Sequence, residues 1–209
     1  MTKILIVTAV EAEREALLRG LSPAGRGRVE VVAAGVGAAA AAVATAAVLA
    51  GGGDGGYRLV VSAGIGGAFP DRAGPGDLLQ AGRIIAADLG AQTPEGFASI
   101  AELGFGQPVE YPGHPLVGLG ETITGDLLTV NTVTGTAERA KELLAQHPEA
   151  IGEAMEGYGV ALAARHFGVP VAELRAVSNL IGPRDRGAWR IRPALDALSA
   201  AAGALIEEN

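Results

Sequence analysis

Short apolar runs alternate along this chain with longer segments of helical character, and this alternation limits the possible folds more than any other feature. The runs at 3–10, 29–34, 59–63 and 171–177 are rich in Val, Ile, Leu and Ala and have the length of buried strands. Strands that alternate with helices favour an α/β fold in which helices cover both faces of a sheet. We therefore predict a three-layer α/β/α architecture with a central mixed, largely parallel sheet.

The remaining segments continue the pattern. We expect further strands at 78–87, 127–134 and 151–155. We expect helices at 11–21, 38–49 and 136–146, a helix that follows the strand at 151–155 and ends at 167, and a last helix at 193–207. We expect a flexible loop at residues 51–56, and the stretch 88–126, rich in Pro, Gly and Thr, is the least legible part of the sequence. We see neither an internal repeat nor a linker, so we expect residues 1–209 to form one domain.

The charge balance argues against a nucleic-acid-binding protein. The net charge is −7 and the isoelectric point is near 5.0, and the only lysines are Lys3 and Lys141. A metal site is not expected either, because His114, His147 and His166 share no ligand spacing. No cofactor is expected.

The apolar segments do not predict a membrane protein. The longest, 38–50, is rich in alanine and falls short of the roughly 20 residues that span a bilayer. The first run leads into Glu11 and Glu13 without a cleavage site, which favours a strand over a signal peptide. The absence of cysteine excludes disulfides and is compatible with a cytoplasmic protein.

Two polar residues stand at the ends of predicted strands. Glu156 lies where the strand at 151–155 gives way to a helix, and Asn179 follows the strand at 171–177. Open α/β sheets bind ligands at the carboxyl ends of their strands, so the pair indicates a site for a polyhydroxylated small molecule. The alternative is structural, with Glu156 capping a helix and Asn179 capping a strand.

A glycine turn supports a rival function, a dinucleotide-binding domain. Residues 35–40 (GVGAAA) match a relaxed fingerprint between a strand and a helix. However, the turn follows the second strand rather than the first, and the nearest acidic partner, Asp54, lies in a loop. Close packing of backbone and helix is the simpler interpretation. The glycines at 64–67 (GIGG) are more informative, because they would expose backbone polar groups to a planar ligand such as a purine.

Several segments together resemble the purine-nucleoside phosphorylase and nucleosidase superfamily, in its methylthioadenosine/S-adenosylhomocysteine nucleosidase-like branch. They are 4–13 (ILIVTAVEAE), 62–69 (SAGIGGAF), 154–159 (AMEGYG) and 175–179 (RAVSN). Within that branch, 175–189 is most similar to the futalosine hydrolases of menaquinone biosynthesis. The resemblance implies a nucleoside phosphorylase/hydrolase-like fold, a homodimer, and release of hypoxanthine and dehypoxanthine futalosine from futalosine.

The resemblance also implies roles for individual residues. Glu13 falls on the general base that activates water, and Asn179 on the catalytic position that contacts the purine. Glu156 falls on the acceptor of the ribose hydroxyls, and Met155 on the residue packed under the sugar. Without the resemblance, Glu13 would be taken for a solvated residue of the first helical turn.

Five further residues fall on substrate-binding positions. Ile65, Gly66 and Gly67 resemble the turn beside the base and the ribose. Val133 falls on a backbone contact to the purine, and Trp189 on an aromatic residue that closes over the 5′ substituent. Trp189 could otherwise serve as an exposed loop anchor. Tyr111-Pro112 is a candidate for the loop that a neighbouring subunit contributes.

The sequence departs from the nucleosidase pattern at three positions. Asn179 replaces an aspartate, Ala154 replaces a first glutamate, and Thr132 stands in place of a phenylalanine that stacks on the purine. These departures argue against adenine as the base and fit hypoxanthine. A methylthioadenosine/adenosylhomocysteine-type nucleosidase and a purine-nucleoside phosphorylase remain the alternatives within the superfamily.

The chemistry itself favours hydrolysis. Cleavage of an N-ribosidic bond passes through an oxocarbenium-like sugar, which an ionised Glu156 would stabilise through the 2′- and 3′-hydroxyls. A phosphate nucleophile would need arginines after the first strand, whereas this turn carries Glu11, Glu13 and Glu15. The sequence leaves open the group at the 5′ end and which arginine, Arg184, Arg186 or Arg190, meets an acidic substrate tail.

Overall fold

Four parallel strands form the first part of the sheet in this computed structural model, which describes residues 3–52 and 56–207. Their order is β2 (Val29–Ala33), β1 (Lys3–Thr8), β3 (Tyr57–Ala68) and β10 (Val171–Leu180). The strands are mostly Val, Ile, Leu and Ala, and β1 is buried from its second residue to its last. Such strands, apolar on both faces, need helices on both sides.

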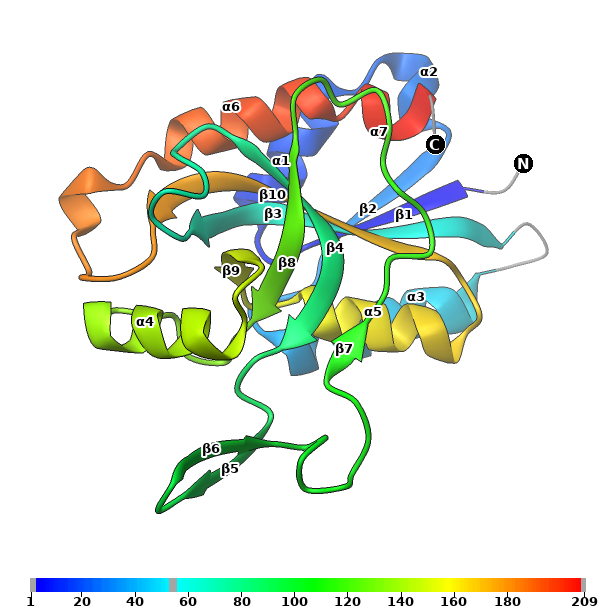
Figure 1. Cartoon of the computed structure of the whole chain (residues 1–209). Helices are drawn as coiled ribbons and strands as arrows, with labels where there is room; N and C mark the ends of the chain where they lie inside the picture. Colours follow the sequence, from blue (N-terminus) through cyan, green and yellow to red (C-terminus); the bar gives the residue numbers. More distant parts are fainter. Residues whose placement is uncertain (1–2, 53–55, 208–209) are drawn as a thin grey trace.

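The second part of the sheet closes on the first. β10 pairs antiparallel with β4 (Leu78–Ala86), which pairs parallel with β8 (Ile123–Thr129). β8 pairs parallel with β9 (Ala150–Ala154), and β9 pairs antiparallel with the end of β3. Because β3 and β10 also pair with each other, these five strands form a ring (Figure 1). The predicted mixed sheet is confirmed, whereas its closure was not predicted.

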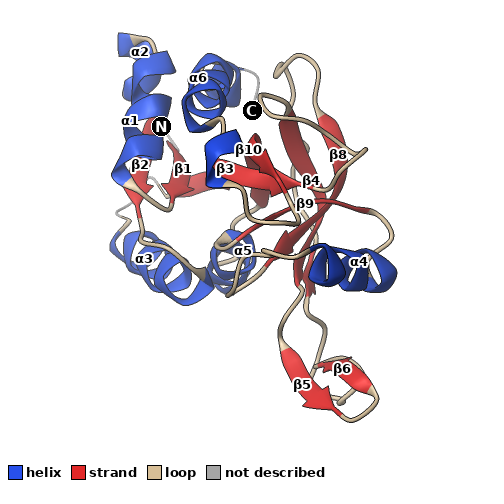
Figure 2. Ribbon diagram, turned by 90° about the vertical axis from the view of Figure 1, so that its left-hand side faces the viewer, coloured by secondary structure: helices blue, strands red, loops and turns tan. Residues whose placement is uncertain are grey.

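Helices cover both faces of the first part of the sheet (Figure 2). On one face lie α1 (Glu11–Gly20), α2 (Pro23–Arg26), α6 (Ile191–Ala201) and α7 (Ala204–Glu207). The other face carries α3 (Ala38–Gly51) and α5 (Gly157–His166). These two helices pack closely, because a Cβ at Gly159 would lie 1.9 Å from the Ala38 carbonyl oxygen. α4 (Ala137–Gln146) packs its buried side against β8 and β9.

Several predicted boundaries were wrong, mostly where a neighbouring strand extends an element. β3 continues through the glycines at 64–67, which were predicted as a turn, because β9 and β10 pair with them. β10 reaches Leu180 rather than ending at 177, and β8 occupies 123–129 rather than 127–134. The last helix is divided into α6 and α7. The centre of the predicted loop at 51–56, including Asp54, lies outside the described residues.

The stretch 88–126, the least legible part of the sequence, contains a small hairpin. β5 (Gly90–Thr93) pairs with β6 (Gly96–Ser99), and the hairpin projects from the body of the molecule (Figure 1). β7 (Val109–Glu110) then adds a short strand to β4.

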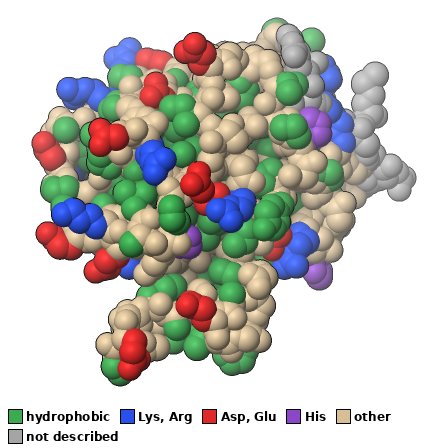
Figure 3. All heavy atoms as spheres, viewed as in Figure 1, with side chains coloured by type: hydrophobic (Ala, Val, Ile, Leu, Met, Phe, Trp, Pro, Cys, Tyr) green, Lys and Arg blue, Asp and Glu red, His purple; other side chains and the backbone are tan. Residues whose placement is uncertain are grey.

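In the part of the chain that the structure describes, no helix is long and apolar enough to cross a bilayer. Acidic and basic side chains are interspersed over the face in Figure 3.

Candidate active site

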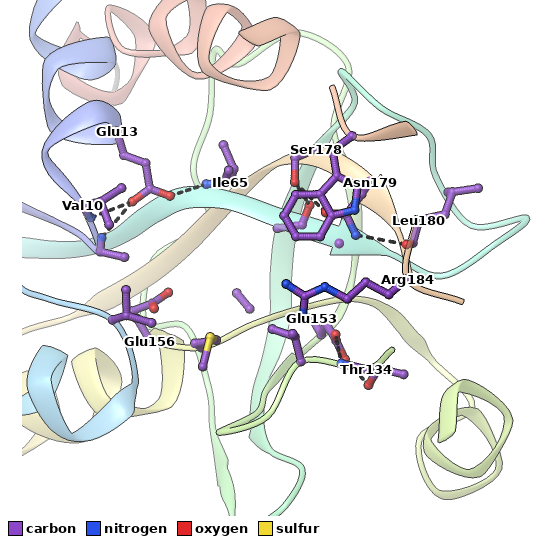
Figure 4. A pocket seen from close by; sticks show the side chains of 18 of the residues that line it. Val10, Glu13, Ile65, Thr134, Glu153, Glu156, Ser178, Asn179, Leu180 and Arg184 are labelled. Atoms are coloured by element: carbon purple, nitrogen blue, oxygen red, sulfur yellow. Dashed lines mark hydrogen bonds between the residues drawn. The ribbon is translucent and has the colours of Figure 1, made fainter. Parts of the chain in front are cut away.

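A cavity of about 340 Å³ lies where β1, β3, β9 and β10 end. The two residues predicted to be catalytic, Glu13 and Asn179, both line it. So do the seven predicted to bind substrate, namely Ile65, Gly66, Gly67, Val133, Met155, Glu156 and Trp189. The structure therefore brings together residues from well-separated parts of the chain. The carboxylates of Glu13 and Glu156 lie at one end of the cavity and Asn179 at the other (Figure 4).

Glu13 is a buried carboxylate in the first turn of α1, a few residues after β1 ends, and not the solvated residue that this position suggests. Its side chain is 3% exposed. One oxygen accepts from the backbone N–H of Ala9 at 2.9 Å and of Val10 at 3.2 Å, and the other accepts from Ile65 at 2.9 Å. β1 pairs with β3 only as far as Val7, so Glu13 satisfies a β3 amide beyond the end of that pairing.

Burial raises the pKa of the Glu13 carboxyl above its usual value. The amide of Ile65, the charge of Arg175 and the amides of Val10 and Ala9 all act in the opposite direction. Gly64 allows the acid and the arginine to approach, because a Cβ there would lie 2.6 Å from Glu13 Oε1 and 2.8 Å from Arg175 Nη1. A carboxylate with a raised pKa that can still ionise is suited to accept a proton.

Glu156 occupies the N-cap position of α5 without capping the helix through its side chain. Instead, its carboxylate accepts a hydrogen bond of 3.1 Å from the backbone N–H of Gly37 and forms an ion pair of 3.3 Å with Arg175. Gly37 has φ 96°, a conformation that favours glycine. The glycine turn at 35–37 thus holds a carboxylate in the cavity wall, which accounts for it without a dinucleotide.

Arg175 is the buried cation beneath the site. It is 1% exposed, and donates to Glu173 at 2.9 Å and to Ser62 at 2.8 Å besides its contact with Glu156. Burial disfavours its charge, but the carboxylates of Glu173, Glu156 and Glu13 outweigh burial and raise its pKa. The guanidinium therefore stays charged and favours the ionised form of the carboxylates around it.

Asn179 lies inside β10, just past a bulge in the pairing of β10 with β3. The Ser178 hydroxyl lies 2.8 Å from Asn179 Oδ1 and 3.1 Å from the Gly66 carbonyl oxygen, so it can donate to either. Asn179 Nδ2 donates to the Leu180 carbonyl at 3.0 Å. The amide keeps one further N–H and one further acceptor position for a ligand.

A third buried carboxylate, Glu153, lines the cavity near Asn179 and was not predicted from the sequence. It accepts hydrogen bonds of 2.7 Å from both the backbone N–H and the hydroxyl of Thr134. Burial raises the pKa of Glu153, and the two bonds from Thr134 act against that effect. A carboxylate inside a strand next to the motif 154–159 was the signal that could have found it.

The outer part of the cavity carries an aromatic ring and a cation. Trp189 is half-buried, and the guanidinium carbons of Arg184 and Arg186 lie 5.6 Å and 6.0 Å from its ring centroid. Of the three arginines considered for an acidic tail, Arg184 lines the cavity. Figure 4 shows its side chain directed toward the middle of the pocket. The separation from Trp189 is within the range of a cation–π contact.

Comparison with known proteins identifies the family. A sequence profile of the phosphorylase superfamily matches residues 6–208, nearly the whole chain. The chain belongs to the phosphorylase superfamily. Among related members of the superfamily, a futalosine hydrolase of Streptomyces coelicolor is 49% identical, over 97% of this chain and 94% of that protein. A futalosine hydrolase of Acidothermus cellulolyticus is 45% identical, over 97% and 90%.

Solved structures from the phosphorylase superfamily share the fold. The futalosine hydrolase of Helicobacter pylori superposes with a TM-score of 0.81 at 19% identity, covering 100% of this chain and 98% of that one. A methylthioadenosine/S-adenosylhomocysteine nucleosidase from Colwellia psychrerythraea, solved with adenine, has a TM-score of 0.78 at 21% identity, covering 98% and 93%. The predicted nucleoside phosphorylase/hydrolase-like fold is thereby confirmed.

Two further observations concern the loop at Tyr111 and the possibility of a metal site. Tyr111 is 70% exposed, and the neighbouring Gly113 bonds to Val171 at the opposite end of β10 from Asn179. Tyr111 does not line the cavity. Among the residues that the structure describes, no three His, Asp or Glu side chains are grouped as a metal site would need.

Proposed function

We propose that this chain hydrolyses the N-ribosidic bond of futalosine and releases hypoxanthine and dehypoxanthine futalosine, a step of menaquinone biosynthesis. The observation that carries the proposal is the arrangement of the cavity, with two buried carboxylates at one end and a carboxamide at the other. The end with the carboxylates is suited to a ribose and a water molecule, and the end with the carboxamide is suited to a 6-oxopurine. The futalosine hydrolases with 49% and 45% identity indicate the same substrate.

In this mechanism Glu156 binds the ribose. Its carboxylate accepts hydrogen bonds from the 2′- and 3′-hydroxyls, and these bonds strengthen as the sugar becomes cationic. The contacts with Gly37 and Arg175 fix the carboxylate before the substrate binds, so little reorganisation is needed in the transition state. Met155 lines the cavity beside Glu156 and packs under the sugar.

Glu13 acts on the nucleophile. A water molecule attacks C1′ of the ribose while the bond to N9 of the base breaks and its electron pair passes to the purine. Glu13 takes the proton of that water, a contribution typically worth about 10² to 10⁴ in rate. The three backbone N–H groups that bind its oxygens set the direction of the carboxylate.

Asn179 stabilises the departing base. Its remaining N–H donates to O6 of hypoxanthine, and its carbonyl oxygen accepts from the N7 proton that solvent supplies as the base leaves. A carboxamide is no proton donor for N7, so its help is hydrogen bonding rather than acid catalysis. Ile65, Gly66 and Gly67 lie alongside, Val133 contacts the purine through its backbone, and Trp189 covers the 5′ substituent.

Water rather than phosphate is the nucleophile in this proposal. The first turns of α1 carry Glu11, Glu13 and Glu15, of which Glu13 lines the cavity, and Arg175 is held by carboxylates beneath the cavity. A phosphate dianion next to Glu13 would be repelled. This feature favours a hydrolase over a purine-nucleoside phosphorylase.

The test is chromatography of the base and sugar products from futalosine, inosine, methylthioadenosine and adenosylhomocysteine, each with and without inorganic phosphate. We expect hypoxanthine from futalosine at a rate that phosphate does not change. Release of adenine from methylthioadenosine at a higher rate would instead favour the methylthioadenosine/adenosylhomocysteine-type nucleosidase. Formation of a sugar 1-phosphate would identify a phosphorylase.

We further propose that residues 1–209 form one domain and that two copies assemble as a homodimer. Tyr111 is exposed and Pro112 is half-buried, and neither lines the cavity of its own chain, so both would be available to complete the site of the partner subunit. Analytical ultracentrifugation of the wild type and of Tyr111→Ser tests this assembly. A monomeric wild-type protein with full activity would contradict it.

A further inference from the structure

Glu153 is a buried acceptor in the cavity wall to which the mechanism gives no role. Its side chain is 5% exposed, and both of its oxygens already accept one hydrogen bond from Thr134. A carboxylate has about four acceptor positions, so two remain unused. Since Glu153 lines the cavity, a ligand is the natural donor for them.

The sheet places Glu153 beside Asn179 with only a glycine between. Gly67 of β3 pairs with Glu153 on one side and with Asn179 on the other, which puts the two Cα atoms about 10 Å apart across two strand spacings. Directly opposed residues of an antiparallel pair project to the same face. A Cβ at Gly67 would lie 2.8 Å from Ile181 Cγ1 and 3.3 Å from Asn179 Nδ2, so the glycine lets Ile181 and Asn179 pack closely over the strand at this point.

Figure 4 shows Asn179 and Glu153 at the same end of the cavity, away from Glu13 and Glu156. That end is where the proposed mechanism places the base. The six-membered ring of a purine lying there would have Asn179 on one edge and Glu153 on another.

The edges of hypoxanthine and adenine differ at the atom next to position 6. Hypoxanthine carries a proton on N1 and is a donor there, whereas N1 of adenine is an acceptor. If Asn179 binds O6 and N7, the N1–H of hypoxanthine still needs an acceptor. A carboxylate can only accept, so it pairs with hypoxanthine and repels the lone pair of adenine N1.

We propose that Glu153 accepts the N1–H of the 6-oxopurine and is, together with Asn179, the determinant of base specificity. The proposal deepens the proposed function and rests on it for the identity of the base. Asn179 reads O6 and N7, and Glu153 reads N1, so three neighbouring atoms of the base are recognised. Thr134 holds Glu153 in place through both of its hydrogen bonds.

Glu153 could instead serve only to fasten Thr134 and its loop. The variant Glu153→Gln separates the two roles, because a carboxamide can still accept from the Thr134 N–H while offering an N–H in place of the second oxygen. Thr134→Val is the matched control, since it removes one of the two bonds to Glu153 and leaves the carboxylate intact.

The experiment is calorimetric titration of the wild type and both variants with hypoxanthine and adenine. We expect the wild type to prefer hypoxanthine by at least about tenfold. Glu153→Gln should lose at least about tenfold of this preference. Thr134→Val, which keeps the carboxylate and its hydrogen bond from the Thr134 N–H, should lose less of it. An unchanged preference in Glu153→Gln, or an equal loss in both variants, would overturn the proposal.

A measurement on the unmodified protein guards against a variant that fails to fold. The wild type should bind 1-methylhypoxanthine, which lacks the N1–H, at least about tenfold more weakly than hypoxanthine. Equal binding of the two bases would refute the role of Glu153. If the wild type releases no base from futalosine yet shows the Glu153-dependent preference, only the proposed function fails.

Discussion

The carboxylate of Glu156 and the guanidinium of Arg175 form an ion pair of 3.3 Å in which both side chains are buried. Glu173 and Ser62 hold the same guanidinium from other directions, and Gly37 holds the carboxylate. The group that would bind the sugar is therefore fixed before any substrate arrives. Such preorganisation is how charged groups in a protein interior stabilise developing charge efficiently.

Replacement of Glu13 by glutamine should remove the general base. We expect Glu13→Gln to fold normally and to lose at least about a hundredfold in kcat with futalosine. Glu15→Gln, an exposed carboxylate on the same helix, is the control and should retain full turnover. A near-wild-type kcat for Glu13→Gln would leave Glu13 with only the structural task of binding the Ile65 amide.

The pH profile should report the ionisation of Glu13. Only the carboxylate can take a proton, so kcat/KM should fall as the pH decreases through the pKa of Glu13. Because burial raises this pKa, the fall should occur at a higher pH than for an ordinary glutamate. The effect on stability has the opposite sign, because a raised pKa means that the fold favours the protonated carboxyl and loses that contribution as the pH rises.

Steady-state kinetics of the wild type and of Glu13→Gln would check this, measured from about pH 4, near the pKa of an unperturbed glutamate, to about pH 9. The acidic limb should be absent from the residual activity of the variant. An identical limb in both proteins would assign it to another group.

Loss of the charge on Glu156 should affect the chemical step as well as binding. In Glu156→Gln the hydrogen bonds to the ribose remain possible but no longer strengthen as the sugar becomes cationic. We expect kcat to fall along with kcat/KM in steady-state assays with futalosine. A rise in KM at constant kcat would mean that Glu156 binds substrate and transition state equally.

Removal of Arg175 should destabilise the whole protein. Arg175→Met leaves the buried carboxylates of Glu173 and Glu156 without their cation, and breaking a buried pair in this way costs about 3–5 kcal/mol. Arg165→Met is the control, because Arg165 is largely exposed and pairs with Glu110 at the surface. Surface pairs contribute about 0–1 kcal/mol. Urea unfolding of the two variants makes the comparison, and equal losses would contradict it.

The amide of Asn179 should set part of the base preference. In Asn179→Asp the donor to O6 becomes an acceptor, which mispairs with hypoxanthine and suits the amino group of adenine. A mispaired buried group costs about 1–3 kcal/mol. We expect lower kcat/KM for futalosine and higher relative activity with its 6-amino counterpart, measured by release of the two bases. An unchanged ratio would remove Asn179 from base recognition.

The local sequence pattern was sufficient to predict those helices and strands whose own residues show an apolar run or a helical periodicity. β1, α1 and α4 lie within a few residues of their predicted bounds, since apolar runs and helical periodicity mark them. The glycines of β3 predict a turn from their local sequence, yet they lie in a strand because β9 and β10 pair with them. Pairing between distant segments decides such cases, and no local window contains it.

The site shows the same division. Glu13, Glu156 and Asn179 were identified through motifs, and the structure brings them into one cavity. Glu153 and Arg175 were missed as site residues because both belong to strands, where a lone charge gives no indication of its partners. Their partners, Thr134 and Ser62, are remote in sequence, so only the fold reveals that these charges are satisfied.

The ring of β3, β9, β8, β4 and β10 has a consequence for how the cavity could fail. Each of these strands has partners on both sides, so none can slide along a neighbour without breaking two ladders of hydrogen bonds. A slip of one residue would turn a side chain to the opposite face of the sheet. The alignment of Gly67 with Glu153 and Asn179 therefore persists as long as the ring of strands stays paired. A mutation that loosens the loops around the cavity should weaken the affinity for substrate before it changes the preference between bases.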